Sequence, residues 1–243
     1  MNLLKPRSLA AVLSLCAAGA QAASFVDTFS DGTGLIQTDS APYVEAWLPS
    51  AEAPGGGRYL ANTIGAPAAQ NGKFMFAAIQ AGAYFTLSDA AIPLYTNLTY
   101  GVANLLGQDL SLDLRSEGAF RLDFRYVSAP ISLTATVITA HGAGSFSSVA
   151  DFATGLNASS AQTLLIPFSA FVNDAGNASP VDWGDIDAIT FIVSGPGGAG
   201  FALDTFSTAP VPEPASIGLL LAGLGLVGGR VYRATAARID RAT

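Results

Sequence analysis

Acidic side chains near the two ends of the sequence are the first candidates for chemistry. The stretch "DTFSDGTG" places Asp27 and Asp31 four residues apart beside a turn, and Asp204 is expected to approach them from the last strand. Ligation by oxygen atoms alone suits Ca²⁺. Aspartates that cap turns have the same spacing. The sequence therefore leaves two alternatives for these residues, a calcium site and turn capping.

Aromatic side chains are the second candidates, because Tyr and Trp offer flat apolar faces with a polar edge on which sugars stack. They gather in the first half of the chain beside polar loops, at Tyr43, Trp47, Tyr59, Tyr84, Tyr95 and Tyr100. We predict that Tyr43, Trp47 and Tyr59 bind a ligand. The alternative for each of them is packing in the core.

Catalysis has little support in the residue inventory. His141 is the only histidine, it lies in the Gly-rich stretch "TAHGAGS", and no G-x-S-x-G motif is present, so a nucleophilic triad is excluded. A glycosidase with paired carboxylates would have to use Glu45, Glu52 or Glu117, and the first two flank Trp47. We predict a non-enzyme; a polysaccharide-acting hydrolase or lyase and a purely structural matrix protein remain as alternatives.

Charge and cysteine content exclude further classes. The single cysteine, Cys16, cannot form an intrachain disulfide, and with one histidine the chain cannot assemble a Cys/His zinc site. The chain carries a net charge of −7, and residues 23–210 hold 16 acidic and five basic side chains, a net of about −11. Such a surface would repel phosphate backbones, so nucleic acid is excluded as a partner.

Residues 1–22 have the three parts of a secretory signal peptide. Lys5 and Arg7 are followed by a short apolar stretch and by Ala20-Gln21-Ala22, an A-x-A cleavage pattern. Leu15 precedes Cys16 where a lipoprotein would have a small residue. The sequence therefore predicts export through the Sec machinery, with a buried N-terminal helix as the alternative.

The C-terminal region is divided into a linker at 209–214, an apolar segment at 215–232 and a basic tail at 233–243. At ~1.5 Å per residue a helix over 215–232 reaches roughly 27 Å, enough for a thin bilayer core. Arg230 and Arg233 are expected to stop transfer and to hold the tail in the cytoplasm. The sequence thus predicts a transmembrane helix here.

Val211, Pro212, Glu213 and Pro214 precede this apolar, Gly-rich segment and its basic end. The order of these three features resembles the PEP-CTERM sorting signal of Gram-negative bacteria. The resemblance implies recognition by exosortase, an integral membrane protease or transpeptidase, in bacteria that make exopolysaccharide. Two prolines keep the motif extended and separate from the helix that follows. A plain C-terminal membrane anchor is the alternative.

Residues 23–208 are predicted to form the folded body. The stretch "AFRLDFRYV" alternates Phe120, Leu122, Phe124 and Tyr126 with polar residues, and similar short runs are separated by turn signals such as "QNGK" and "GPGGAG". This pattern predicts an all-β fold, an antiparallel β-sandwich.

The segments "FVDTFSDG", "GGGRYL", "GAFRLDFRY" and "DWGDIDAITFIVSGPGGAGFALDTF" together resemble the galactose-binding-like jelly rolls shared by many carbohydrate-binding modules. The resemblance implies that the first and last strands pair, which would bring Asp27, Asp31 and Asp204 near one another. We therefore expect an exported protein, held transiently at the inner membrane and then sorted to the cell surface or extracellular matrix, with weak binding to exopolysaccharide.

Overall fold

Antiparallel strands make up the described part of the chain. The computed structural model describes residues 25–39, 42–64, 73–101, 109–139, 142–148, 161–173 and 181–210. The signal peptide at 1–22, His141, the motif at 211–214, the apolar segment at 215–232 and the tail at 233–243 lie outside these residues. Within the described ranges, no helix has the length and apolar character needed to cross a membrane. Residues Ala23–Pro210 form a compact unit by themselves.

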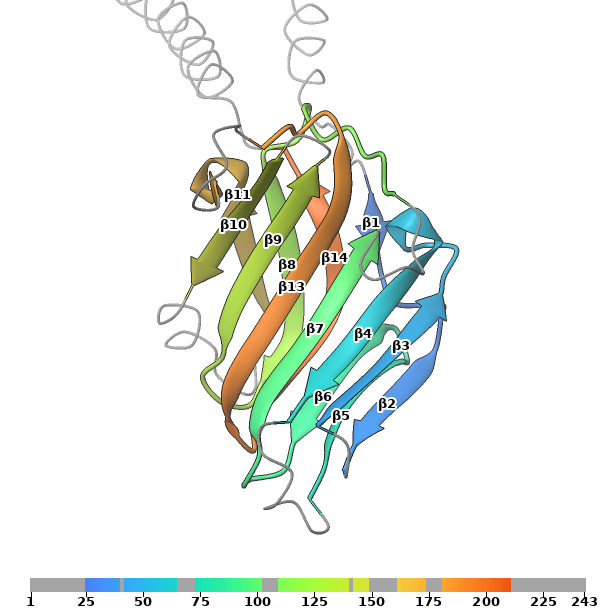
Figure 1. Cartoon of the computed structure of the whole chain (residues 1–243), viewed down its shortest axis with the longest axis vertical. Helices are drawn as coiled ribbons and strands as arrows, with labels where there is room; N and C mark the ends of the chain where they lie inside the picture. Colours follow the sequence, from blue (N-terminus) through green and yellow to red (C-terminus); the bar gives the residue numbers. More distant parts are fainter. Residues whose placement is uncertain are drawn as a thin grey trace, which may run out of the picture. The chain divides into compact units, whose positions relative to one another are not determined.

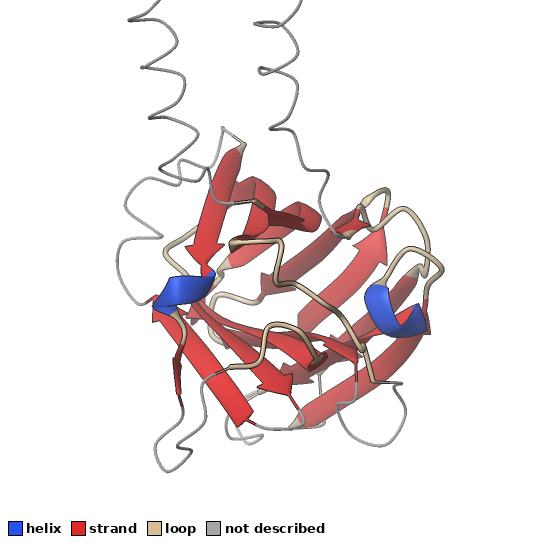
Figure 2. Cartoon of the chain, turned by 90° about the horizontal axis from the view of Figure 1, so that it is seen from above, coloured by secondary structure: helices blue, strands red, loops and turns tan. Residues whose placement is uncertain are grey.

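The described residues contain fourteen strands and two short 3-10 helices (Figure 2). The strands are β1 (Val26–Asp27), β2 (Gly34–Thr38), β3 (Tyr43–Pro49), β4 (Gly57–Thr63), β5 (Met75–Gln80), β6 (Ala83–Ser88), β7 (Pro93–Gly101), β8 (Ala119–Val127), β9 (Ser132–Thr139), β10 (Gly142–Ser148), β11 (Gln162–Pro167), β12 (Val172–Asn173), β13 (Ile186–Gly197) and β14 (Gly200–Ala209). The helices are η1 (Pro54–Gly56) and η3 (Phe168–Ala170).

The strands form two antiparallel sheets that pack as a β-sandwich, as the alternation predicts. Sheet A has the order β11-β8-β14-β6-β5-β2, and β1 pairs with β14 beside this path. Sheet B has the order β12-β10-β9-β13-β7-β4-β3 and crosses the front of the view in Figure 1. The first and last strands pair, with Val26 opposite Ser207 and Asp27 opposite Phe206.

The apolar positions of the alternating strands fill the space between the sheets. In β8, Phe120, Leu122 and Phe124 are buried as predicted. Tyr126 is not on their face, because the register against β14 shifts between Ala202 and Leu203, and Val127 takes the inward position. Such a shift is a β-bulge, in which one extra residue turns the following side chains to the other face.

Phe120 lies at the centre of an aromatic cluster that closes one end of the core. Its ring contacts those of Phe168, Trp183, Phe191 and Phe206 at centroid distances of 4.9, 6.1, 6.2 and 5.6 Å. Aromatic pairs of this kind add to the stability gained from burial. Trp183 therefore belongs to the core, whereas the other tryptophan, Trp47, lies on sheet B.

Candidate functional site

The outer face of sheet B brings the three aromatic residues of the prediction together. In β3 and β4, Trp47 is paired with Tyr59 and Tyr43 with Thr63. Directly paired residues of antiparallel strands point to the same face, and successive residues alternate. Because Arg58 points into the core and is fully buried, its neighbour Tyr59 and the residues paired with it point outward.

The same register continues across the sheet and places polar side chains in rows that cross the strands. Each row takes one outward residue from each of β3, β4, β7, β13 and β9, and each of these residues lies opposite the next one across the sheet, either by direct pairing or by continuation of the register. The first row is Tyr43, Thr63, Tyr95, Ser194 and Ser132, the second is Glu45, Ala61, Asn97, Ile192 and Thr134, and the third is Trp47, Tyr59, Thr99, Thr190 and Thr136. The face is therefore rich in hydroxyl groups, with aromatic rings towards β3.

Tyr43, Glu45 and Tyr59 form a hydrogen-bonded chain at the β3 edge of this face. The Tyr43 hydroxyl donates to the Glu45 carboxylate, and the hydroxyls of Tyr43 and Tyr59 lie 2.7 Å apart. Partial burial, together with the hydrogen bond and negative charge of Glu45, raises the pKa of Tyr43 to about 12. Tyr43 therefore stays protonated at physiological pH and keeps this geometry fixed.

Trp47 lies against the backbone of the neighbouring strand. A Cβ atom on Gly57, the first residue of β4, would overlap the Trp47 indole and would also come within 2.8 Å of the Leu48 carbonyl oxygen. Gly57 thus leaves the space that the indole fills. Trp47 is only partly buried.

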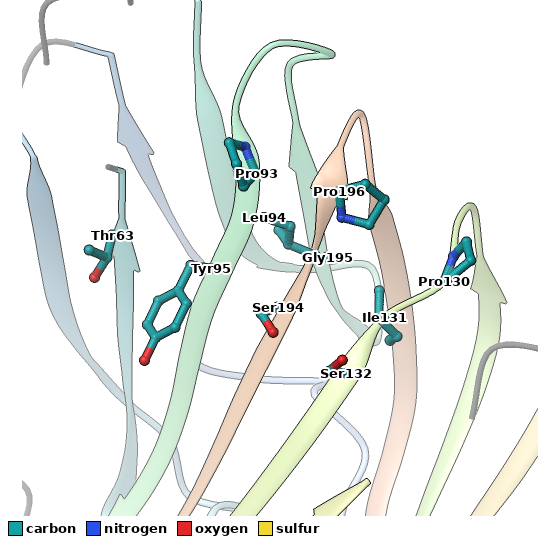
Figure 3. Close-up of a pocket in the computed structure, with 10 residues that line it drawn as sticks. All are labelled: Thr63, Pro93, Leu94, Tyr95, Pro130, Ile131, Ser132, Ser194, Gly195 and Pro196. Atoms are coloured by element: carbon teal, nitrogen blue, oxygen red, sulfur yellow. The ribbon is translucent and has the colours of Figure 1, made fainter. Parts of the chain in front are cut away.

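A cleft of about 630 Å³ opens at one end of sheet B (Figure 3). Thr63, Tyr95, Ser194 and Ser132 of the first row line it. Three prolines also line it: Pro93 at the start of β7, Pro196 near the end of β13, and Pro130 in the connection between β8 and β9. Proline has a fixed φ and no backbone donor, so these residues form a stiff apolar wall. The cleft therefore combines a hydroxyl-bearing floor with apolar edges.

The most exposed aromatic side chains of the described residues also mark this face. Tyr43 is 43% exposed, Tyr95 39% and Phe74 36%. Tyr43 and Tyr95 belong to the first row, and Phe74 precedes β5 of sheet A. Tyr59, which was predicted to bind a ligand, is only 3% exposed, and Tyr84 and Tyr100 are buried in the core.

Asp27 and Asp31 come together, but around an arginine. Asp27 and Arg58 are fully buried and form an ion pair of 2.5 Å, and Tyr100 donates to the same carboxylate at 2.7 Å. Arg58 also donates to the Asp31 backbone carbonyl at 2.8 Å and lies 3.4 Å from the Asp31 carboxylate. Burial would by itself lower the pKa of Arg58, but Asp27 raises it. A guanidinium therefore occupies the position between these carboxylates.

Asp31 also caps a turn, as its second interpretation predicts. It accepts hydrogen bonds from the Ser50 hydroxyl at 2.5 Å and from the Ala51 backbone at 2.6 Å. The Ser50 hydrogen bond is the main cause that lowers the pKa of Asp31. This contact ties the β1–β2 connection to the loop before β4.

Asp204 has a different partner. It is the extra residue where the register of β14 shifts against β8, and it pairs with Arg125 at 2.8 Å. Among the described residues, no three His, Cys, Asp or Glu side chains are placed so that they could hold a metal ion. Each of the three aspartates thus has an arginine partner in the structure.

The predicted sorting residues Val211 to Pro214 and the stop-transfer residues Arg230 and Arg233 lie outside the described residues, so their identification depends on sequence comparison. Residues 210–234 carry the PEP-CTERM protein-sorting motif. The PEP-CTERM motif implies export, sorting to the cell surface and processing by exosortase. No curated protein matches the chain.

Several solved structures are similar to the body of this chain. The family 11 carbohydrate-binding module of the cellulase Lic26A-Cel5E of Clostridium thermocellum is 13% identical, with a TM-score of 0.41, over 79% of this chain and 97% of the module. The family 11 module from the same organism in complex with a β-1,3-1,4-mixed-linked tetrasaccharide is 13% identical, with a TM-score of 0.39, over 76% and 94%. TmCBM61 in complex with β-1,4-galactotriose is 17% identical, with a TM-score of 0.24, over 70% and 89%. These likenesses assign no ligand to this chain.

Two of the three glutamates named for the glycosidase alternative, Glu45 and Glu52, have separate partners. Glu45 holds Tyr43 on the outer face of sheet B, whereas Glu52 accepts hydrogen bonds from Ser30 and Thr28. The Ser30 hydrogen bond, followed by that of Thr28, lowers the pKa of Glu52. A general acid needs a raised pKa. Glu52 is therefore unsuited to that role.

Sequence reasoning missed the polar residues of the site. Asn97, Ser132 and Ser194 belong to strands whose hydroxyl and amide residues alternate with apolar ones, as in "YTNLTY" and "SLTATVIT". This alternation signals a polar outer face. Which strands lie side by side, and hence which polar residues share a row, follows only from the register.

Proposed function

We propose that the chain is an exported protein that is sorted through its PEP-CTERM motif and that binds a glycan weakly through the outer face of sheet B. The carrying observation is that Tyr43 and Tyr95, two of the most exposed aromatic side chains of the described residues, share one row with Thr63, Ser132 and Ser194. Its place of action would be the cell surface or the extracellular matrix.

The composition of this face supports a sugar ligand. Tyrosine and tryptophan rings supply apolar area at a small loss of conformational freedom, and neighbouring hydroxyl groups exchange hydrogen bonds with those of a sugar. Ligand sites commonly combine such apolar walls with a few polar groups. Because the cleft is open and uncharged, we expect weak binding by one copy. Many copies along one polymer would bind more tightly by avidity.

The glycan site is tested with segment 23–210, which forms a compact unit by itself. Retention on polysaccharide affinity gels is measured for Tyr95→Ala and Trp47→Ala, with Phe74→Ala as the matched control, because Phe74 is equally exposed but lies beside sheet A. We expect both face variants to lose retention and the control to keep it. No retention of the parent segment on any polymer, including those of the host, would leave a structural matrix protein.

Catalysis is tested on the same polymers by assaying reducing ends and unsaturated products. We expect no turnover. Turnover that disappears on Glu45→Gln or Glu52→Gln would instead establish the hydrolase or lyase alternative.

Sorting is tested on the complete chain by intact-mass analysis after export from a host that contains exosortase. We expect a mature form that starts near Ala23 and ends near the motif Pro212-Glu213-Pro214. A mature chain that retains Leu219 to Arg241 would show a membrane anchor in place of a sorting signal.

A further inference from the structure

Sheet B carries almost no charge on its outer face. Its seven strands contain only three charged residues, Glu45, Arg58 and Asp187. Arg58 points into the core, and Asp187 lies at the start of β13, away from the cleft at its other end. None of the residues that line the cleft is charged. Glu45 is therefore the one charged residue in the three rows of this face.

Hydrogen bonding at the β3 edge further restricts the ligand. Tyr43 has one hydroxyl proton and donates it to Glu45. In the 2.7 Å contact between the two tyrosines, Tyr59 must then be the donor and Tyr43 the acceptor. Both protons are thus used inside the chain. Because Tyr59 is only 3% exposed, the capacity left for a ligand is that of Tyr43 and Glu45, and it is for accepting. A ligand that meets them must donate, as a sugar hydroxyl does and as a carboxylate or sulfate does not.

The basic residues of the described body other than Arg58 lie outside the strands of sheet B. Lys73 comes before β5 of sheet A, and the three exposed arginines have acidic partners. Arg121 and Arg125 are on β8 of sheet A, and they pair with Asp123 and Asp204. Arg115 pairs with Asp113 in the connection before β8. An anionic ligand on sheet B would therefore meet Glu45 and the net negative charge of the body without a solvent-facing cation on the strands of that sheet, at a cost in electrostatic energy.

We infer that the outer face of sheet B selects uncharged, hydroxyl-rich glycans and rejects glycans that carry carboxylate or sulfate groups. This inference depends on the proposed glycan binding and specifies its substrate class. A protein can discriminate between ligands by disfavouring the wrong one. Here the negative charge of an anionic glycan would have no cationic partner, and the acceptor groups at the β3 edge would receive no hydrogen bond from its carboxylate or sulfate groups.

The test uses polymers that share a backbone and differ in charge. Segment 23–210 is assayed by affinity electrophoresis against hydroxyethylcellulose and carboxymethylcellulose, dextran and dextran sulfate, and pectin before and after removal of its methyl esters. We expect at least tenfold tighter binding to the neutral member of any pair that binds, with little dependence on salt. Equal or tighter binding to the anionic member would overturn the charge selection and leave glycan binding intact, whereas binding to none of the polymers would remove the proposed function itself.

Two variants separate charge from shape. Thr63→Lys places a cation beside the cleft, and Gln37→Lys places the same charge on β2 of sheet A as the control. We expect Thr63→Lys alone to gain binding to the anionic polymers, and this gain should fall as salt is added. Glu45→Gln keeps an acceptor for Tyr43 and removes the negative charge, so it should narrow the discrimination between neutral and anionic polymers. If Thr63→Lys binds the neutral polymer and gains nothing for the anionic one, charge does not decide the selectivity.

Discussion

Removal of the Asp27 carboxylate is expected to destabilise the body strongly. The carboxylate accepts four hydrogen bonds between the two sheets, from the backbone N–H of Phe29 at 2.9 Å, from Arg58 Nε at 2.7 Å and Nη2 at 2.5 Å, and from the Tyr100 hydroxyl at 2.7 Å. Asp27→Asn keeps the size of the side chain but turns an amide donor towards groups that are themselves donors. It also leaves the buried guanidinium with only the more distant Asp31 carboxylate.

The magnitude follows from breaking a buried ion pair on one side, which costs about 3–5 kcal/mol. For a body of this length that corresponds to a fall in melting temperature of about 6–20 °C. The control is Asp123→Asn, which removes the ion-pair partner of Arg121 on sheet A, where both side chains are partly exposed. An exposed pair contributes about 0–1 kcal/mol, so the control should melt close to the parent.

The assay is urea unfolding of segment 23–210, completed by a double-mutant cycle. Replacing both partners by apolar residues, in Asp27→Leu with Arg58→Met, should cost less than Arg58→Met alone, because no charge is then left buried without a partner. A loss below about 1 kcal/mol for Asp27→Asn, or additive single effects in the cycle, would refute the reasoning.

Three further outcomes are expected. Gly57→Ala should displace the Trp47 indole, change the tryptophan fluorescence and lower glycan retention several-fold while segment 23–210 stays folded, because the added Cβ takes the space of the ring. The folded-state pKa values of Asp31 and Glu52 are lowered, so their contribution to stability is present above the unfolded values of about 4 and is lost as the pH falls below them. Urea unfolding at pH 6 and pH 3 should therefore show a smaller acid loss for Glu52→Gln than for the parent. EDTA should leave the melting temperature unchanged, since arginines pair with the aspartates of the predicted calcium site; a lower melting temperature in EDTA would restore that site.

The sandwich could be predicted because its signals are local. Alternation in β8 and in "ISLTATVIT" follows directly from the pleat of a strand, and a half-buried strand can be identified from its own residues. The same spacing places Tyr43 and Trp47 on one face of β3. That Trp47 lies opposite Tyr59 could not be predicted in the same way, because it depends on the register of the β3–β4 hairpin.

The two arginine–aspartate contacts could not be predicted, because their partners are distant in sequence. Arg58 occupies an inward position of β4, where a charged residue is not expected. It is accommodated there because Asp27, 31 residues earlier, approaches from β1. Asp204 was expected beside Asp27, but bulges in β14 and β8 bring Asp204 and Arg125 together instead. The alternation of apolar and polar residues does not show where a bulge lies. It therefore could not decide whether Asp204 is a calcium ligand or the partner of an arginine.

The direction of the last two strands of the body separates the glycan cleft from the sorting segment. β13 runs to Pro196 at the cleft, a turn containing Gly198 reverses the chain, and β14 leads away from that end to Pro210 (Figure 1). β1 lies beside the end of β14, where the Thr208 backbone donates to the Phe25 carbonyl at 3.3 Å. The ten residues of β14 extend over roughly 33 Å at ~3.3 Å each. Phe25 and Pro210, the first and last described residues, thus lie far from the cleft, and a polymer bound there would not cover Pro210, the residue at which the PEP-CTERM match begins in the sequence. The proposed binding and the sorting can therefore take place on the same molecule without competing for one surface.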